Sequence, residues 1–96
     1  MHSDEASPSV RLQLDLSRRF AAAMMSGPDF DRAFLRARGP DWGVTSDVMG
    51  EVLDEIFYGV DDYVADDSLR EPEKGDLDEE QLREIVRTQL RRLDEA

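Results

Sequence analysis

The chain has 96 residues, 40% of them hydrophobic, and carries a formal net charge of −11 at pH 7. Its length suggests a single domain with one core, and the absence of cysteine excludes disulfide bonds and thiolate metal sites. No basic region followed by an apolar run opens the chain, and the longest apolar stretch, 20–25, is far shorter than the ~20 residues that span a bilayer. We therefore expect a soluble, cytoplasmic protein.

The excess negative charge is confined to the second half of the chain. Residues 1–45 contain six acids and six arginines, so the whole excess lies in 46–96, and no Lys or Arg occurs between Gly39 and Leu69. Contact with a phosphate backbone or an anionic membrane needs clustered cations. We therefore expect neither direct nucleic-acid binding nor membrane binding, and the acidic surface favours a basic protein partner.

The first predicted helix covers about 10–26. Its apolar face, read from spacings of three and four, consists of Leu12, Leu16, Phe20, Ala23 and Met24. Apolar residues also alternate over 10–16, so a short strand competes for this half, although the run of Ala and Met that follows favours helix. Gly27 and Pro28 supply a stop and a new start.

The second predicted helix covers 28–38, with Phe30, Phe34 and Ala37 on its apolar face. The Gly-Pro pair at 39–40 ends it. A loop over 40–45 follows and holds Trp42, which we expect to cap the core.

The third predicted helix has the clearest pattern. Thr45 or Ser46 can cap it, and its apolar stripe consists of Met49, Val52, Leu53, Ile56, Val60, Tyr63 and Val64. Gly59 in mid-helix costs about 1 kcal/mol relative to Ala. A close helix crossing at this position would explain the glycine.

A loop over 66–76 precedes the fourth predicted helix. Asp78 can cap its start while Gln81 reaches back in a capping box, and Leu77 and Leu82 stand where a hydrophobic staple needs them. The apolar face consists of Leu82, Ile85, Val86, Leu90 and Leu93. Acids lie at the positive end of the helix dipole and arginines at the negative end.

Four amphipathic segments with short connections favour an all-α fold, a small antiparallel four-helix bundle. We expect residues 1–8 to form a disordered tail and 9–96 a single helical-bundle domain.

Catalytic chemistry has few candidates. The single histidine, His2, lies in the predicted tail without fixed neighbours, and the Glu-x-x-His pairs of a di-metal bundle are missing. The aspartates at 61, 62, 66 and 67 do not match the spacing of a calcium-binding EF-hand loop. We therefore predict no catalytic residue, no metal site, no cofactor and no enzymatic activity.

Acidic residues and one tyrosine lie opposite the apolar stripe of the third predicted helix. They are Glu51, Asp54, Glu55, Tyr58, Asp61 and Asp62, and Asp66 and Asp67 extend the row into the loop. A solvated face is the simpler explanation, but such faces usually place Lys or Arg four residues from an acid, and here Glu51 and Glu55 form a like-charged pair at that spacing. We therefore favour a binding role for an uncompensated acidic row, with Tyr58 as either an aromatic anchor or a half-exposed packing residue.

Two segments of the chain carry a family pattern. They read Val52-Leu-Asp-Glu-Ile-Phe-Tyr-Gly-Val-Asp-Asp-Tyr-Val-Ala-Asp-Asp-Ser-Leu-Arg and Gly75-Asp-Leu-Asp-Glu-Glu-Gln-Leu-Arg. The matching positions are Phe57, Val60, Asp61, Tyr63, Leu69, Arg70, Leu77, Asp78, Glu79, Leu82 and Arg83, and Phe20, Ser26-Gly27 and Phe30 look like a first helix, turn and second helix. Over roughly 12–93 the chain resembles the bacterial colicin-D-type immunity proteins, although the 39–47 loop matches nothing in that pattern.

The resemblance implies a helical-bundle inhibitor that binds the basic nuclease domain of a cognate tRNA-cleaving toxin and fills its active cleft with acidic side chains in place of the RNA. Asp61 is the matched acid, and the other members of the row are extrapolations from the charge pattern. We therefore hypothesise an immunity protein, monomeric when free, that binds its toxin through the eight residues of the row. The alternative is an acidic regulatory adaptor or DNA-mimic protein that binds a host DNA-binding protein.

Overall fold

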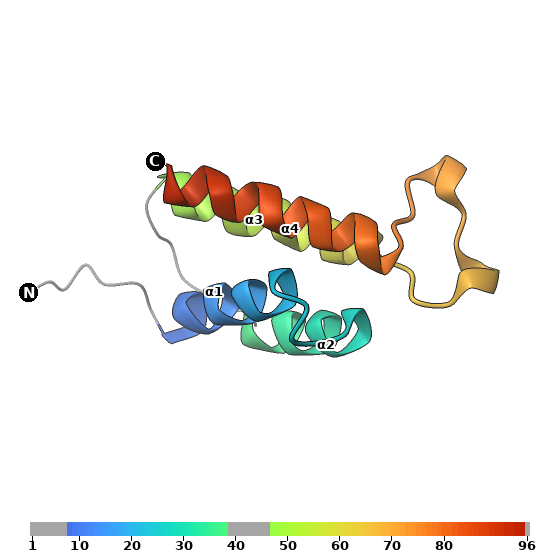
Figure 1. Ribbon diagram of the computed structural model, residues 1–96, viewed down its shortest axis with the longest axis horizontal. Coiled ribbons are helices and arrows are strands. Elements are labelled where there is room, and N and C mark those ends of the chain that lie inside the picture. Colours follow the sequence, from blue (N-terminus) through green and yellow to red (C-terminus); the bar gives the residue numbers. More distant parts are fainter. Residues whose placement is uncertain (1–7, 39–46, 96) are drawn as a thin grey trace, which may run out of the picture.

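Four α-helices account for most of the residues that the computed structural model describes, which are 8–38 and 47–95. The helices are α1 (Pro8–Ala21), α2 (Gly27–Arg38), α3 (Asp47–Asp62) and α4 (Glu79–Asp94), and the loop before α4 contains two 3-10 turns, η1 (Asp67–Leu69) and η2 (Pro72–Lys74). α1 and α2 form one antiparallel hairpin and α3 and α4 form another (Figure 1). The predicted all-α fold and small four-helix bundle are confirmed.

The core joins aromatic residues of the first hairpin to aliphatic residues of the second. The rings of Phe20 and Phe30 stack with their centroids 4.4 Å apart, and Phe34 tilts against Phe30. Their buried partners on α3 and α4 are Val52, Leu53, Ile56, Val60, Leu82, Val86 and Leu90. Burial of one such side chain contributes roughly 1.5–3 kcal/mol, so this core fixes α3 against the rest of the bundle.

α1 is helical throughout, so the strand alternative for 10–16 is wrong, and it ends at Ala21 instead of near 26. The N–H of Met24 donates to Arg19 O at 2.9 Å and the N–H of Ala23 to Phe20 O at 3.0 Å. This is the hydrogen-bond pattern of a Schellman motif, in which one residue turns left-handed. Ala23 takes that conformation, with φ 63°, although glycine is the usual residue there.

The buried face of α1 also differs from the prediction. Leu12 and Met24 are exposed, Met24 because the helix has already ended. Val10, Gln13 and Ser17 are buried instead, together with the predicted Leu16 and Phe20. The two polar residues satisfy their hydrogen bonds locally: Ser17 Oγ donates to Gln13 O at 2.8 Å, and Gln13 Nε2 donates to Ser9 Oγ at 3.2 Å.

α2 begins at Gly27, one residue before the predicted start, and ends at Arg38 as predicted. Ser26 Oγ accepts the N–H of Asp29 at 3.3 Å, which is the bond expected of an N-cap serine. Phe30 and Phe34 are buried and Ala37 is partly buried, which confirms the predicted apolar face.

α3 and α4 approach closely at Gly59, which agrees with the explanation suggested for the glycine. A Cβ added at Gly59 would lie 3.1 Å from Leu82 Cδ1 and 3.5 Å from Ile85 Cγ2. α3 ends at Asp62, two residues earlier than predicted, because Tyr63 leaves the helix to form an isolated parallel bridge with Leu77. This bridge closes the base of the loop that protrudes from the end of the hairpin (Figure 1).

The predicted capping box at the start of α4 is confirmed. Asp78 Oδ1 accepts the N–H of Gln81 at 2.8 Å, and Gln81 Oε1 accepts the N–H of Asp78 at 2.9 Å. The predicted apolar face holds as well, with Leu82, Val86 and Leu90 buried and Leu93 partly buried.

Arg83 is a buried residue of α4 that ties this helix to the α1–α2 turn. Its Nε donates to Phe20 O at 2.9 Å and Nη2 to Met25 O at 3.3 Å, and its guanidinium lies 4.4 Å from the centroid of the Phe20 ring. Glu79 and Glu80 form ion pairs with it at 2.9 and 2.7 Å. We call this set of contacts the arginine clasp.

Some predictions fall on residues outside the described ranges. These are the Thr45 or Ser46 cap, the 40–45 loop with Trp42, and the proposed tail over its first seven residues; Pro8 is the first residue of α1.

Candidate functional site

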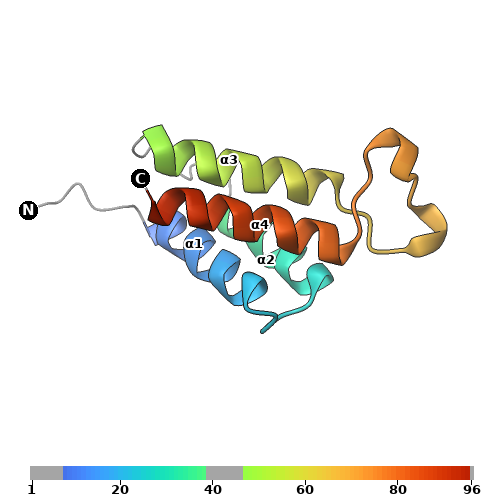
Figure 2. The ribbon, with the colours of Figure 1, turned by 45° about the horizontal axis from the view of Figure 1, so that its top comes forward.

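The predicted acidic row of α3 lies on the side of the helix that faces away from the core. Its helical members, which we call the acidic flank, are Glu51, Asp54, Glu55, Tyr58, Asp61 and Asp62, and all are exposed except Asp54, which is partly exposed. α4 lies between α3 and α1 (Figure 2), and no other described helix covers the outer side of α3. The predicted placement opposite the apolar stripe is therefore confirmed.

Asp54 has an ion-pair partner, although the sequence had led us to expect none. Arg38, at the end of α2, forms an ion pair with Asp54 Oδ1. The same guanidinium donates to Leu53 O at 3.1 Å and lies 4.5 Å from the centroid of the Phe57 ring. The i,i+4 spacing considered in the sequence analysis detects ion pairs within one helix only. It could not indicate a partner on another helix, so this pair was missed.

Glu51 is also compensated from another helix. Arg92 of α4 forms an ion pair with Glu51, and both side chains are about half exposed. Such an exposed pair is worth only about 0–1 kcal/mol. The expectation of a wholly uncompensated row is therefore wrong at Glu51 and Asp54.

Glu55, Asp61 and Asp62 retain free negative charge. Across the described ranges, none of the three has an ion pair or a side-chain hydrogen bond. Asp61 and Asp62 also occupy the last turn of α3, which has no basic residue. That turn is the negative end of the helix dipole, where acids are unfavourable.

Asp66 and Asp67 lie in the protruding loop and both have local partners. Asp66 Oδ1 accepts the N–H of Ser68 at 2.9 Å and its hydroxyl at 2.7 Å, and so caps η1. The hydrogen bond from the Ser68 side chain, followed by the one from its backbone, lowers the pKa of Asp66 below its ordinary value. Asp67 forms an ion pair with Arg70 at 2.8 Å, and Arg70 Nε donates to Val64 O at 3.0 Å. The expectation of uncompensated charge is therefore wrong at Asp67 as well.

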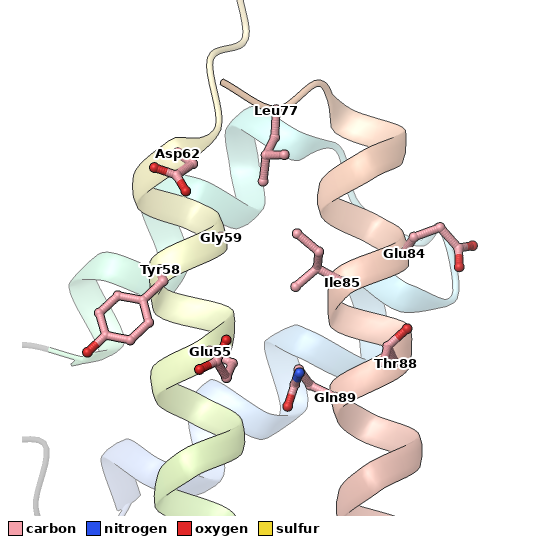
Figure 3. Close-up of a pocket in the computed structure, with 9 residues that line it drawn as sticks. All are labelled: Glu55, Tyr58, Gly59, Asp62, Leu77, Glu84, Ile85, Thr88 and Gln89. Atoms are coloured by element: carbon pink, nitrogen blue, oxygen red, sulfur yellow. The ribbon is translucent and has the colours of Figure 1, made fainter. Parts of the chain in front are cut away.

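A shallow groove of about 390 Å³ runs between α3 and α4 beside the acidic flank. It is lined by Glu55, Tyr58, Gly59, Asp62, Leu77, Glu84, Ile85, Thr88 and Gln89. The side chains of Glu55, Ile85 and Gln89 point into the space between the two helices, whereas the Tyr58 ring points outward from α3 (Figure 3). Three members of the predicted row, Glu55, Tyr58 and Asp62, therefore border a concavity that the sequence analysis did not predict.

Tyr58 stands on the rim of this groove with 55% of its surface exposed. Its ring contacts Phe57 at a centroid distance of 5.8 Å. An exposed tyrosine on a rigid helix can act as an anchor for a partner.

We also searched the described residues for metal-binding groups and membrane-spanning helices. Within 8–38 and 47–95, no group of three or more His, Cys, Asp or Glu side chains is arranged to hold a metal ion. None of the helices in these ranges is long and apolar enough to cross a membrane. The acidic flank and the groove beside it bring exposed carboxylates, an exposed tyrosine and a concavity together on one surface.

Comparison with known proteins gives one match. The family model described as bacterial self-protective colicin-like immunity matches residues 9–93. No curated protein and no solved structure matches the chain. Because the match covers nearly all of the described residues, the chain belongs to the colicin-like immunity family and serves in bacterial self-protection against a bacteriocin.

Proposed function

We propose that this immunity protein binds the nuclease domain of a cognate tRNA-cleaving, bacteriocin-type toxin and blocks its basic active cleft with the acidic flank of α3. The observation that carries the proposal is the set of exposed, unpaired carboxylates of Glu55, Asp61 and Asp62 on a helix fixed by the core. The protein acts as an inhibitor without enzymatic activity, needs no cofactor, and is a monomer until it meets the toxin. It contacts neither nucleic acid nor membrane directly.

Electrostatics supply the reason for this choice of surface. Carboxylates spaced along a rigid helix present negative charge in a row, as the phosphates of an RNA strand do, so a cleft built to hold RNA attracts them. Such complementarity raises association rates toward about 10⁸–10⁹ M⁻¹s⁻¹ at low salt. Membership in the immunity family favours a toxin over a host DNA-binding protein as the partner.

The contacts within the protein support different roles for the eight proposed binding residues. Glu55, Asp61 and Asp62 supply free charge, whereas Glu51 and Asp54 are held in place by arginines of α4 and α2. Tyr58 offers an aromatic anchor at the middle of the flank. Asp66 and Asp67 carry the negative surface into the protruding loop.

The test compares two triple variants with the same change in net charge. The flank variant combines Asp61→Asn and Asp62→Asn of the acidic flank with Asp66→Asn of the adjoining loop. The control combines Asp15→Asn, Asp29→Asn and Glu95→Gln, which lie on α1, on α2 and after α4. The partner is the nuclease domain of the toxin encoded beside this gene, and association rates are measured across a salt series together with protection of tRNA from cleavage. We expect the flank variant to associate roughly tenfold more slowly at low salt, with a weaker salt dependence. If the flank variant protects tRNA as well as the wild type does, the acidic flank is not the binding surface.

A further inference from the structure

The groove between α3 and α4 combines an apolar floor with acidic ends. Gly59, Ile85 and Leu77 supply the apolar part, and Glu55 and Asp62 stand seven residues apart on α3 (Figure 3). Seven residues correspond to roughly 10 Å along a helix. None of the lining residues is basic.

From this combination we infer that the groove receives one arginine side chain of the toxin. This inference rests on the proposed function and adds a specific contact to it. The methylene stem of the arginine lies over Gly59 and Ile85, and its guanidinium pairs with Asp62, while Glu55 adds negative charge at the other end of the groove. Long cationic side chains bury their stems on apolar surface while their charged ends keep polar partners, so this occupant suits both parts of the groove.

Size and hydrogen bonding favour a single arginine over other occupants. The volume of about 390 Å³ is at the low end of ligand sites, which typically measure ~300–1,000 Å³. A purely apolar side chain would desolvate the two carboxylates without pairing them, which is costly. A carboxylate accepts the planar fork of N–H donors of a guanidinium better than it accepts the point charge of a lysine ammonium, so the Asp62 end of the groove favours arginine.

The two carboxylates are free to take this role. Glu55 and Asp62 have no ion pair within the part of the chain that the structure describes. The third carboxylate of the groove, Glu84, pairs with Arg87 at 2.9 Å, and its side chain points away from α3 (Figure 3). The arginine is therefore expected at the α3 side of the groove.

A matched pair of adjacent residues tests the charged end of the contact. Asp61 and Asp62 are both exposed and unpaired in the last turn of α3, but only Asp62 lines the groove. Asp61→Asn and Asp62→Asn make the same change in net charge and should slow association with the toxin nuclease domain equally. Only Asp62→Asn should raise the dissociation rate, by roughly tenfold, since loss of a buried pair acts on dissociation.

Filling the groove without a change of charge tests whether toxin binding needs an open groove. Thr88 is exposed on α4 and lines the groove, so Thr88→Trp occupies it from within. We expect roughly a tenfold or greater rise in Kd, with the salt dependence of association unchanged. Leu12→Trp adds a similar exposed ring on α1, far from the groove, and should leave Kd as in the wild type; thermal melts confirm that both variants fold.

The outcomes separate this inference from the proposed function. Equal dissociation rates for Asp61→Asn and Asp62→Asn, or a Thr88→Trp variant that binds as tightly as Leu12→Trp, would overturn the groove contact. If this occurs while the triple flank variant still associates slowly, the acidic flank stands as the binding surface and only the arginine contact is wrong. If the triple flank variant behaves as wild type, the proposed function falls and this inference falls with it.

Discussion

Two groups of carboxylates in this protein have opposite surroundings. Glu79 and Glu80, at the start of α4, pair with the buried Arg83, and Glu79 Oε1 also accepts the N–H of Gly27 at 2.9 Å. Asp61 and Asp62, at the end of α3, are exposed and without an ion pair in the described ranges. The first group stands at the positive end of a helix dipole and the second at the negative end. Position and partners, more than composition, thus separate acids that hold the fold from acids available to a partner.

The largest expected effect comes from breaking the arginine clasp. In Arg83→Met, the carbonyls of Phe20 and Met25 lose their donor and Glu79 loses its cation inside the interface between α1 and α4. We expect a loss of about 3 kcal/mol in the free energy of unfolding, measured by urea denaturation. Arg87→Met is the matched control, because Arg87 also donates to a carbonyl of α1, Ala21 O at 3.0 Å, but is 38% exposed; its loss should be about 1 kcal/mol. Equal losses would show that the burial of Arg83 does not increase its contribution to the free energy of unfolding.

Gly27→Ala should have the next largest effect. The added Cβ would clash with Tyr63 Oη and lie 2.9 Å from Glu79 Oε1, so both side chains must move and the Glu79 bond to the Gly27 N–H is strained. We expect a loss of about 2 kcal/mol, again by urea denaturation. Tyr63→Phe removes the closest atom and should recover part of the loss in the double variant. If the two losses simply add, the clash with Tyr63 is not the cause.

Ala23→Gly should stabilise the same turn. Ala23 holds a left-handed conformation at the end of α1, with φ 63°, which costs an alanine roughly 1–2 kcal/mol and a glycine little. Glycine also makes the unfolded chain more flexible, which offsets part of the benefit. We expect a net gain of about 1 kcal/mol, read as a rise in Tm. Ala22→Gly, one residue earlier, should lower Tm instead, and a matching rise there would contradict this account.

The lowered pKa of Glu79 makes the stability contributed by the arginine clasp depend on pH. The hydrogen bond from the Gly27 backbone, followed by the one from Arg83, lowers the pKa of Glu79 from its ordinary 4.5. Its contribution to stability is therefore complete above pH 4.5 and is lost as the pH falls through the lowered pKa of the folded state. In Glu79→Gln the free energy of unfolding should fall less as the pH is lowered through this range. The difference from the wild type should be less than about 1 kcal/mol, because the side chain is partly exposed to solvent.

Local rules account for the features that the sequence predicted well. The capping box at Asp78, the apolar face of α4 and the outward placement of the acidic flank all depend on spacing within a few residues. The end of α1 was missed because Ala23 takes the left-handed conformation that ends the helix, a position at which glycine is usual and would have indicated the helix end. The Arg38–Asp54 pair and the hydrogen bonds from Arg83 to the α1–α2 turn were missed for a different reason: they join residues 16 to 63 positions apart, and only the packed bundle brings them together.

The smallest expected effect on stability belongs to the acidic flank, and its sign is the informative part. Asp61 and Asp62 repel one another and face the carbonyl end of α3 without a basic residue in that turn. Replacing both with Asn should therefore raise the free energy of unfolding by about 0.5 kcal/mol at low salt, with the gain shrinking as salt is added. Chemical denaturation at two salt concentrations measures it, and Glu79→Gln/Glu80→Gln is the matched control, which should destabilise. A loss of stability in the Asp61/Asp62 variant would mean that these acids support the fold, whereas a gain means that they are kept at a cost to the folded state, as residues retained for a partner would be.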